Sequence, residues 1–194
     1  MLRIILFLLP VHSCFAATIY VNINNATPGT GTTWASAYAD LGLALGAAAY
    51  GDQVWVAKGT YKPTTGTDRT ISFLLNAGVS LYGGFTGVET ALGQRNWTTN
   101  VTILSGDIGV VGDASDNSYS VVTITNNHSS ATIDGFTVRD GNANANYPAS
   151  TALQPYNQGG GILCLAGVNG YVGGIVDHCI LTANFAVYGG GFCA

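Results

Sequence analysis

The feature that most constrains the fold is a unit that occurs twice near the end of this 194-residue chain. The first copy covers residues 132–141 and is followed by a triple glycine at 159–161. The second copy covers 175–184 and is followed by a triple glycine at 189–191. Each copy has a short apolar strand, a turn residue and then the glycines. This repetition of one supersecondary unit predicts a solenoid, in which successive units stack on one another.

The two units align on their aspartates, which pairs Asp134 with Asp177 and Gly141 with Asn184. Glycine and asparagine adopt the left-handed backbone conformation more readily than other residues, so the second pair predicts a tight corner at the same place in each unit. The first unit is longer, and its extra residues fall between Asn142 and Gln158. We expect them to form a loop that projects from one coil.

The composition favours a folded β protein and excludes several kinds of partner. Hydrophobic residues make up 47% of the chain and charged residues only 8%, so the sequence can form a core and is not disordered through charge. The formal net charge is −4, with no basic cluster. Nucleic acid and anionic membrane surfaces are therefore not expected as partners.

The first residues have the pattern of a secretory signal peptide. A basic start at Arg3 is followed by a short apolar run at 4–9 and a small-residue cleavage site ending at Ala16. An alternative is a bacterial lipoprotein box, in which Cys14 would carry the lipid. Cleavage after Ala16 would leave three cysteines, which we interpret mainly as small buried hydrophobic residues. These are Cys164, Cys179 and Cys193.

One segment has helical periodicity and the rest of the chain alternates between short strands and turns. Apolar residues recur at helical spacing over 36–49, with Asp40 in the first turn and Gly51 just past the end. A helix that follows the first strand of a solenoid would cover its open end, so we expect an N-terminal cap. The expected strands are 19–23, 54–57, 71–75, 79–82, 102–104, 120–125, 131–133, 136–138, 161–165 and 172–181.

The chain from about residue 19 onward resembles the opening of bacterial right-handed parallel β-helix repeat proteins of the pectin-lyase-like superfamily. The segments that carry the resemblance are 34–41, 51–63, 79–85 and 102–107, with Glu89, Thr90, Gln94, Arg95 and Trp97 between them. The two units with triple glycines are also similar to the repeats of polymorphic outer-membrane proteins.

This resemblance implies an all-β fold, a right-handed parallel β-helix with an N-terminal capping helix. We expect a signal peptide at 1–16 and one domain at 17–194, with the cap at about 17–60 and the coils at about 61–194. The resemblance also implies a secreted, extracellular or outer-membrane-surface protein of a bacterium. The second repeat stops at Ala194 where it should continue, so we expect the chain to be part of a larger protein.

Many enzymes with this fold cleave acidic polysaccharides, using carboxylates, Ca²⁺ and a basic residue. The nearest constellation consists of Asp134, Asp177 and Arg139, with Asp140 and His178 close by in the sequence. If the repeat alignment is correct, the two aspartates lie about 5 Å apart, where one pKa would rise or a cation would be recruited. Each aspartate also immediately precedes a corner residue, and aspartate is a common turn former. We therefore favour a structural role for both aspartates and assign no catalytic residue.

Two further groups of residues are candidate binding sites. Asp107, Asp113, Asp116 and Asn117 bring oxygen ligands together in a turn-rich segment, which makes Ca²⁺ a candidate ligand, although a solvated loop is the favoured alternative. No cofactor is otherwise expected. Tyr147 and Tyr156 lie in the extra loop, where their rings could stack on sugars while neighbouring amides bond hydroxyl groups.

These observations lead to two functional hypotheses. The first is a secreted or cell-surface structural protein of the adhesin type that binds surface glycans or other cell-surface components, without enzymatic activity. The alternative is a polysaccharide lyase or glycosidase whose catalytic coils lie largely beyond residue 194.

Overall fold

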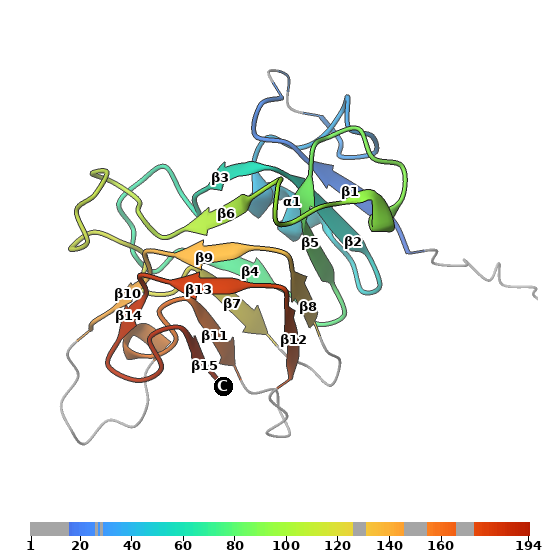
Figure 1. Ribbon diagram of the computed structural model, residues 1–194. Coiled ribbons are helices and arrows are strands. Elements are labelled where there is room, and N and C mark those ends of the chain that lie inside the picture. The colour runs from blue at the N-terminus through green and yellow to red at the C-terminus, as the bar shows by residue number, and fades with distance from the viewer. Residues whose placement is uncertain (1–15, 26, 28, 126–130, 146–154, 166–172) are drawn as a thin grey trace, which may run out of the picture.

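The computed structural model describes residues 16–25, 27, 29–125, 131–145, 155–165 and 173–194 (Figure 1). The expected signal peptide, apart from Ala16, and Tyr147 lie outside these residues. The strands are β1 (Thr18–Val21), β2 (Gln53–Ala57), β3 (Gly59–Tyr61), β4 (Phe73–Leu75), β5 (Ser80–Phe85), β6 (Thr102–Ser105), β7 (Val122–Thr125), β8 (Ala131–Asp134), β9 (Thr137–Arg139), β10 (Asn142–Ala143), β11 (Ile162–Leu165), β12 (Gly174–Asp177), β13 (Ile180–Thr182), β14 (Phe185–Ala186) and β15 (Phe192–Cys193). The helices are α1 (Leu41–Ala47) and two 3₁₀ turns, η1 (Leu92–Gln94) and η2 (Pro155–Asn157).

The protein is mostly β, as expected, and its described strands pair only in parallel. The largest sheet has the strand order β1-β2-β5-β8-β12, the second β3-β6-β9-β13 and the third β4-β7-β11-β15, and β10 pairs with β14. From β2 onward the chain passes from the first sheet to the second, then to the third, and back to the first. Strands of one sheet are therefore separated in sequence by strands of the other two.

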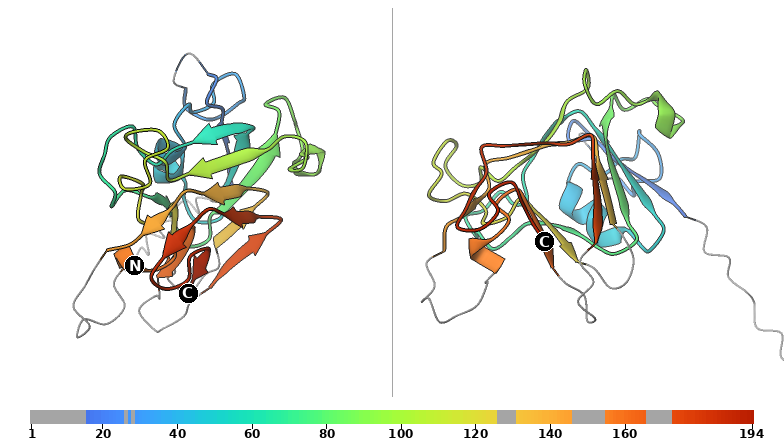
Figure 2. Two further views of the ribbon diagram at one scale, coloured as in Figure 1. Left: turned by 60° about the vertical axis from the view of Figure 1, so that its left-hand side comes forward. Right: turned by 60° about the horizontal axis from the view of Figure 1, so that its bottom comes forward.

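The three larger sheets share one hydrophobic core. Each contributes buried side chains to a single cluster, for example Val54 from β2, Tyr61 from β3 and Phe73 from β4. The right-hand view of Figure 2 shows the strands arranged around this common interior, with α1 inside their outline. Because alternate residues of a strand point to opposite faces, the remaining strand residues face outward.

The strand register confirms the alignment of the two repeat units. Asp177 pairs with Asp134 between β12 and β8, and Leu181 pairs with Val138 between β13 and β9. The triple glycines also align, because they lead into the pair Ile162 and Phe192. Equivalent residues of the two units therefore lie on neighbouring strands of the same sheet.

The corner predicted at Gly141 and Asn184 exists, but the expected left-handed residues were wrong by one position. Positive φ angles occur at Asp140 (64°) and Ala183 (53°), immediately before them. Gly141 is needed for a different reason, since a Cβ there would overlap the carbonyl oxygen of Gly160. Asn184 instead ties the two units together, because its Oδ1 accepts from the Gly141 N–H (3.0 Å) and its Nδ2 donates to the Val138 carbonyl (2.9 Å).

The helix is shorter than the expected 36–49. It begins after Asp40, which is the N-cap and not a first-turn residue, and whose carboxylate accepts from the Leu43 N–H at 3.0 Å. Leu41, Ala44 and Leu45 are buried in the shared core, and α1 packs against β1, β2 and β4. The residues before Asp40 form turns and bends. One of them, Tyr38, makes a parallel β-bridge with Val21 and so is not helical.

Most expected strands are present with small shifts at their ends, and one is divided. The segment expected as a strand over 172–181 forms β12 and β13, because the chain turns between them at His178, where φ is 46°. The loop expected at 142–158 contains β10 at its start and η2 near its end.

Candidate functional site

A row of outward-facing side chains crosses the largest sheet and changes from aromatic to acidic. The strand register places Tyr20 beside Trp55, Trp55 beside Tyr82, Tyr82 beside Asp134, and Asp134 beside Asp177. The aromatic end of the row is covered, since Trp55 stacks on Phe85 at a ring distance of 4.8 Å. The acidic end lies where β8 and β12 finish, since Asp134 and Asp177 are the last residues of these two strands.

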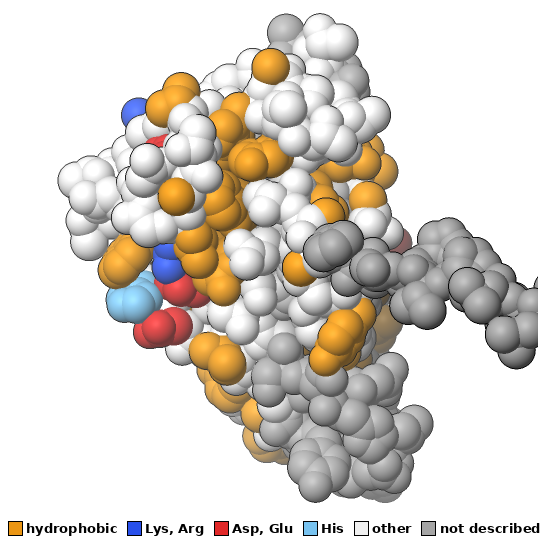
Figure 3. All heavy atoms as spheres, turned by 90° about the vertical axis from the view of Figure 1, so that its right-hand side faces the viewer, with side chains coloured by type: hydrophobic (Ala, Val, Ile, Leu, Met, Phe, Trp, Pro, Cys, Tyr) orange, Lys and Arg blue, Asp and Glu red, His pale blue; other side chains and the backbone are white. Residues whose placement is uncertain are grey.

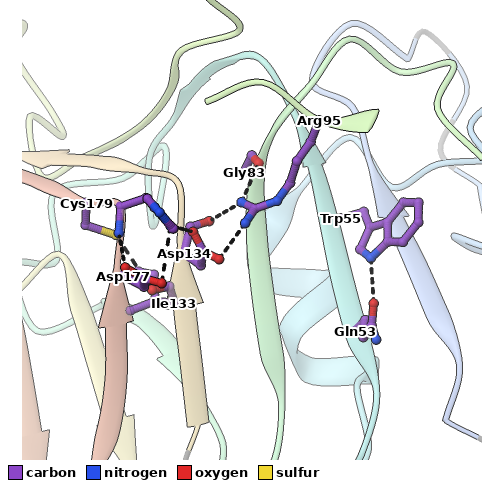
Figure 4. A network of polar contacts seen from close by, with 9 residues as sticks. Gln53, Trp55, Gly83, Arg95, Ile133, Asp134, Asp177 and Cys179 are labelled. Carbon is purple, nitrogen blue, oxygen red and sulfur yellow. Dashed lines mark hydrogen bonds and ion pairs between the residues drawn. The ribbon is translucent and has the colours of Figure 1, made fainter. Parts of the chain in front are cut away.

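Arg95 neutralises the buried member of the acidic pair. Its Nη2 donates to Asp134 Oδ2 at 2.5 Å, and its Nη1 donates to the carbonyl oxygens of Gly83 and Asp134, both at 3.2 Å (Figure 4). Both side chains of the ion pair are about nine-tenths buried. The guanidinium also lies 5.1 Å from the ring centre of Tyr82 and 4.7 Å from that of Trp97. A charge as buried as that of Asp134 requires such a partner.

His178 connects the two aspartates. Its Nδ1 lies 3.0 Å from Asp134 Oδ1 and 3.3 Å from Asp177 Oδ2. The residue takes a left-handed conformation, as does Gly135 at the equivalent corner of the previous unit, with φ angles of 46° and 84°. The indole of Trp97 lies against the imidazole, with 4.2 Å between ring centres. The corner after β12 therefore carries the His178 side chain, whereas the equivalent corner after β8 has a glycine, Gly135.

A groove of about 390 Å³ runs beside this cluster. Trp97 and His178 line the groove, together with the hydroxyl-bearing residues Thr98, Thr102 and Thr137. Figure 3 shows acidic, basic and histidine side chains together at the edge of a band of hydrophobic side chains on this face of the molecule. Unlike Asp134, Asp177 and His178 are accessible, with side-chain exposures of 57% and 42%.

Arg139, the base considered for a lyase, belongs to a different cluster. It ends β9, and its Nε lies 3.1 Å from Asp140 Oδ2. The same carboxylate oxygen accepts from Ser105 Oγ at 2.8 Å. The structure thus brings together Asp134, Asp177 and His178 of the expected constellation, while Arg139 and Asp140 pair with each other at the next corner.

The candidate calcium residues mostly stabilise turns. Asp107 accepts from the Gly112 N–H (2.8 Å) and lies 3.5 Å from Lys62 Nζ. Asp113 accepts from the Ser115 N–H and Asp116 from the Val110 N–H, at 2.9 and 2.8 Å.

The hydrogen bonds from the Ser115 side chain and backbone lower the pKa of Asp113. Within the described part of the chain, these carboxylates do not come together as a group of three ligands. Three buried side-chain oxygens of the described residues have no hydrogen-bond partner, namely Asp116 Oδ1, Asn117 Oδ1 and Ser118 Oγ.

Tyr156 lies in a second groove, of about 220 Å³, on the outer face of the third sheet. Its ring is 5.0 Å from that of Tyr119, and the Arg69 guanidinium lies 4.1 Å from the Tyr119 ring centre. Arg69 is itself fixed, since its Nε donates to the Asn117 carbonyl at 2.7 Å. The other residues that line the groove are Thr70, Ser72, Ser120, Thr123, Leu163 and Leu165. The groove therefore combines a tyrosine pair with four hydroxyl-bearing side chains.

Sequence reasoning missed the roles of Arg95, Trp97 and Tyr119. Arg95 and Trp97 lie in the connection between β5 and β6, which has no counterpart in the repeat units. One available signal was the scarcity of charge, because Arg95 is one of only six lysines and arginines in the chain. Another was His178, which stands where the aligned unit has Gly135.

A comparison of the chain with known protein families, curated proteins and solved structures finds no match. No helix in the described part of the chain is both long and apolar enough to cross a membrane. The class that the structure itself defines is an all-β protein built from parallel sheets.

Proposed function

We propose that this chain is a right-handed parallel β-helix of the pectin-lyase-like kind, with α1 as its N-terminal cap, and that it binds glycans at the surface of a bacterial cell. Three observations support the fold proposal. The described strand pairs are parallel, equivalent repeat residues lie on neighbouring strands, and the chain visits the three sheets in a constant order. A solenoid of this kind presents long outer faces, on which ligand sites can form.

The groove at Tyr156 and Tyr119 carries the functional proposal. Tyrosine rings offer an apolar face to the C–H groups of a sugar, while their hydroxyls can bond its oxygens. Around these rings stand the hydroxyls of Thr70, Ser72 and Thr123, which both donate and accept. Because Arg69 contacts Tyr119, the platform is held in place before a ligand arrives. Among the described residues lining this groove there is no carboxylate or histidine, which favours binding over cleavage.

A polysaccharide lyase or glycosidase is the second candidate, and the paired Asp134 and Asp177 favour it. The basic residue beside them is Arg95, which is buried and bonded to Asp134. A guanidinium in such an ion pair is protonated and cannot accept a proton from a substrate. The corner cluster therefore supports an enzyme less well than the tyrosine groove supports a binding protein.

A glycan array tests the proposal. The chain should bind one class of glycan, and Tyr156→Ala should weaken that binding at least tenfold without changing the circular dichroism spectrum. Tyr188→Ala is the matched control, because Tyr188 is 52% exposed and is not among the residues that line the groove. Tyr147→Ala tests the other loop tyrosine in the same assay. Equal binding by the wild-type protein and Tyr156→Ala would show that the tyrosine groove does not bind the glycan.

A further inference from the structure

We propose that the corner cluster binds a divalent transition-metal ion of the zinc type through Asp134 Oδ1, Asp177 Oδ2 and His178 Nδ1. Each of these residues offers one ligand atom, and the three ligand atoms lie within 4.8 Å of one another. The inference does not depend on glycan binding. The cluster lies at the edge of the first sheet, whereas the tyrosine groove lies on the third sheet.

The distances between the donor atoms suit a bound ion. Zinc lies about 2.0–2.2 Å from nitrogen and oxygen ligands, so neighbouring ligands of one ion are about 3.0–3.5 Å apart. His178 Nδ1 is 3.0 Å from Asp134 Oδ1 and 3.3 Å from Asp177 Oδ2. An imidazole nitrogen carries at most one hydrogen, so His178 Nδ1 can hydrogen-bond both carboxylates only by sharing that hydrogen between them. One metal ion can contact all three atoms.

Arg95 acts as a positioning residue for this site. It holds Asp134 Oδ2, which leaves Oδ1 directed toward His178. Partners of this kind orient metal-binding carboxylates in many proteins. With a neutral imidazole, the four side chains of Arg95, Asp134, Asp177 and His178 sum to a charge of −1. The cluster thus retains negative charge for a cation even after Arg95 is counted.

The conformation of His178 explains why the site occurs only at this corner in the described part of the chain. A left-handed residue at this position directs its side chain back between the two aspartates. The equivalent residue of the preceding unit, Gly135, has no side chain to contribute. Asp177 and His178 are accessible, and His178 lines the 390 Å³ groove, so an ion can reach the site from solvent.

The ligand set selects the class of metal. Calcium and magnesium prefer six or more oxygen ligands, whereas an imidazole with carboxylates suits zinc and its neighbours in the first transition series. Three protein ligands would leave at least one position for water or another ligand. We therefore expect zinc to bind much more tightly than calcium.

Isothermal titration calorimetry with zinc chloride tests this inference, on a Cys193→Ser background because thiolates also bind zinc. The background also carries Cys164→Ala and Cys179→Ala, so that no thiol of the described residues competes for zinc. We expect one ion per chain, with affinity reduced at least tenfold by His178→Gly and by Asp177→Asn. Asp113→Asn, which changes an aspartate of the 107–117 loop, should bind zinc like the background protein.

His178→Gly also separates metal binding from folding, because glycine accepts the left-handed conformation without strain. Its urea unfolding midpoint should match or exceed that of the background protein, and its glycan binding should be unchanged. Cobalt should give a visible absorption spectrum that His178→Gly abolishes. The proposal is overturned if zinc does not bind, if these variants bind it with unchanged affinity, or if calcium binds at least as tightly.

Discussion

Arg95 and Asp134 form a buried ion pair that ties the connection after β5 to the last residue of β8. Replacing Arg95 with methionine keeps most of the side-chain volume but leaves the Asp134 carboxylate buried without its partner. We expect a loss of about 3 kcal/mol in the free energy of unfolding, measured by urea denaturation. The control is Arg139→Met, whose ion pair with Asp140 is more exposed and should contribute less than about 1 kcal/mol. Equal losses in the two variants would contradict the importance assigned to Arg95.

Two glycines of this chain should respond to alanine in opposite directions. At Gly141 a Cβ would overlap the backbone of Gly160, so Gly141→Ala should destabilise the protein by about 3 kcal/mol. At Gly46, inside α1, a Cβ meets nothing within 4 Å, so Gly46→Ala should stabilise it by about 0.5–1 kcal/mol. Thermal and urea unfolding of both variants measure these changes. A harmless Gly141→Ala would show that the two units do not approach so closely.

The buried Tyr61 predicts a loss of stability at alkaline pH. Burial raises the pKa of its hydroxyl from 10.0 to about 12, an effect that the hydrogen bond from the Ile23 N–H partly opposes. Because the folded state holds this proton more tightly, the stabilisation is complete below pH 10.0 and is lost as the pH rises toward 12.

The free energy of unfolding of the wild-type protein should therefore fall relative to that of Tyr61→Phe, by roughly 1.4 kcal/mol per pH unit in this window. Urea denaturation of both proteins on either side of pH 10.0 provides the measurement. A constant difference between the two proteins would show that Tyr61 is accessible to solvent.

Asn184 should contribute to the stability of the folded protein although it lies in the short connection between β13 and β14. Its side chain bonds both the Gly141 N–H and the Val138 carbonyl of the neighbouring unit. Asn184→Ala removes both bonds, and we expect a loss of about 2 kcal/mol in the free energy of unfolding. Asn24→Ala is the control, because its side chain is exposed and lies far outside the repeat units. Comparable effects of the two changes would contradict the role of Asn184 as a link between units.

The repeat made the strand register predictable, because equivalent residues of stacked units must face one another. Asp134 and Asp177 were placed side by side from their position in the alignment alone, and the register confirms it. The same alignment found the Gly141 and Asn184 corner but misjudged its chemistry. A sequence shows that glycine is present, but it does not show whether positive φ or close packing requires it.

The sequence alone did not predict where residues outside the repeat lie in the fold. Arg95 and Trp97 reach the corner from a connection that occurs once, so no pattern relates them to Asp134 or His178. Tyr119 likewise precedes β7 and meets Tyr156 only because the two strands β7 and β11 are neighbours in the third sheet. Short strands such as β10 and β14, of two residues each, carry too few residues to show periodicity.

Chemical-shift mapping by NMR with the glycan that binds best on the array tests the central claim most directly. Adding this glycan to isotope-labelled protein should shift the signals of Tyr119, Tyr156 and Thr123, which line the proposed groove, while those of Trp97 and His178 stay in place. The glycan should also remain intact during the titration. Shifts confined to Trp97 and His178, or the release of unsaturated sugar products, would contradict a binding protein that uses the tyrosine groove.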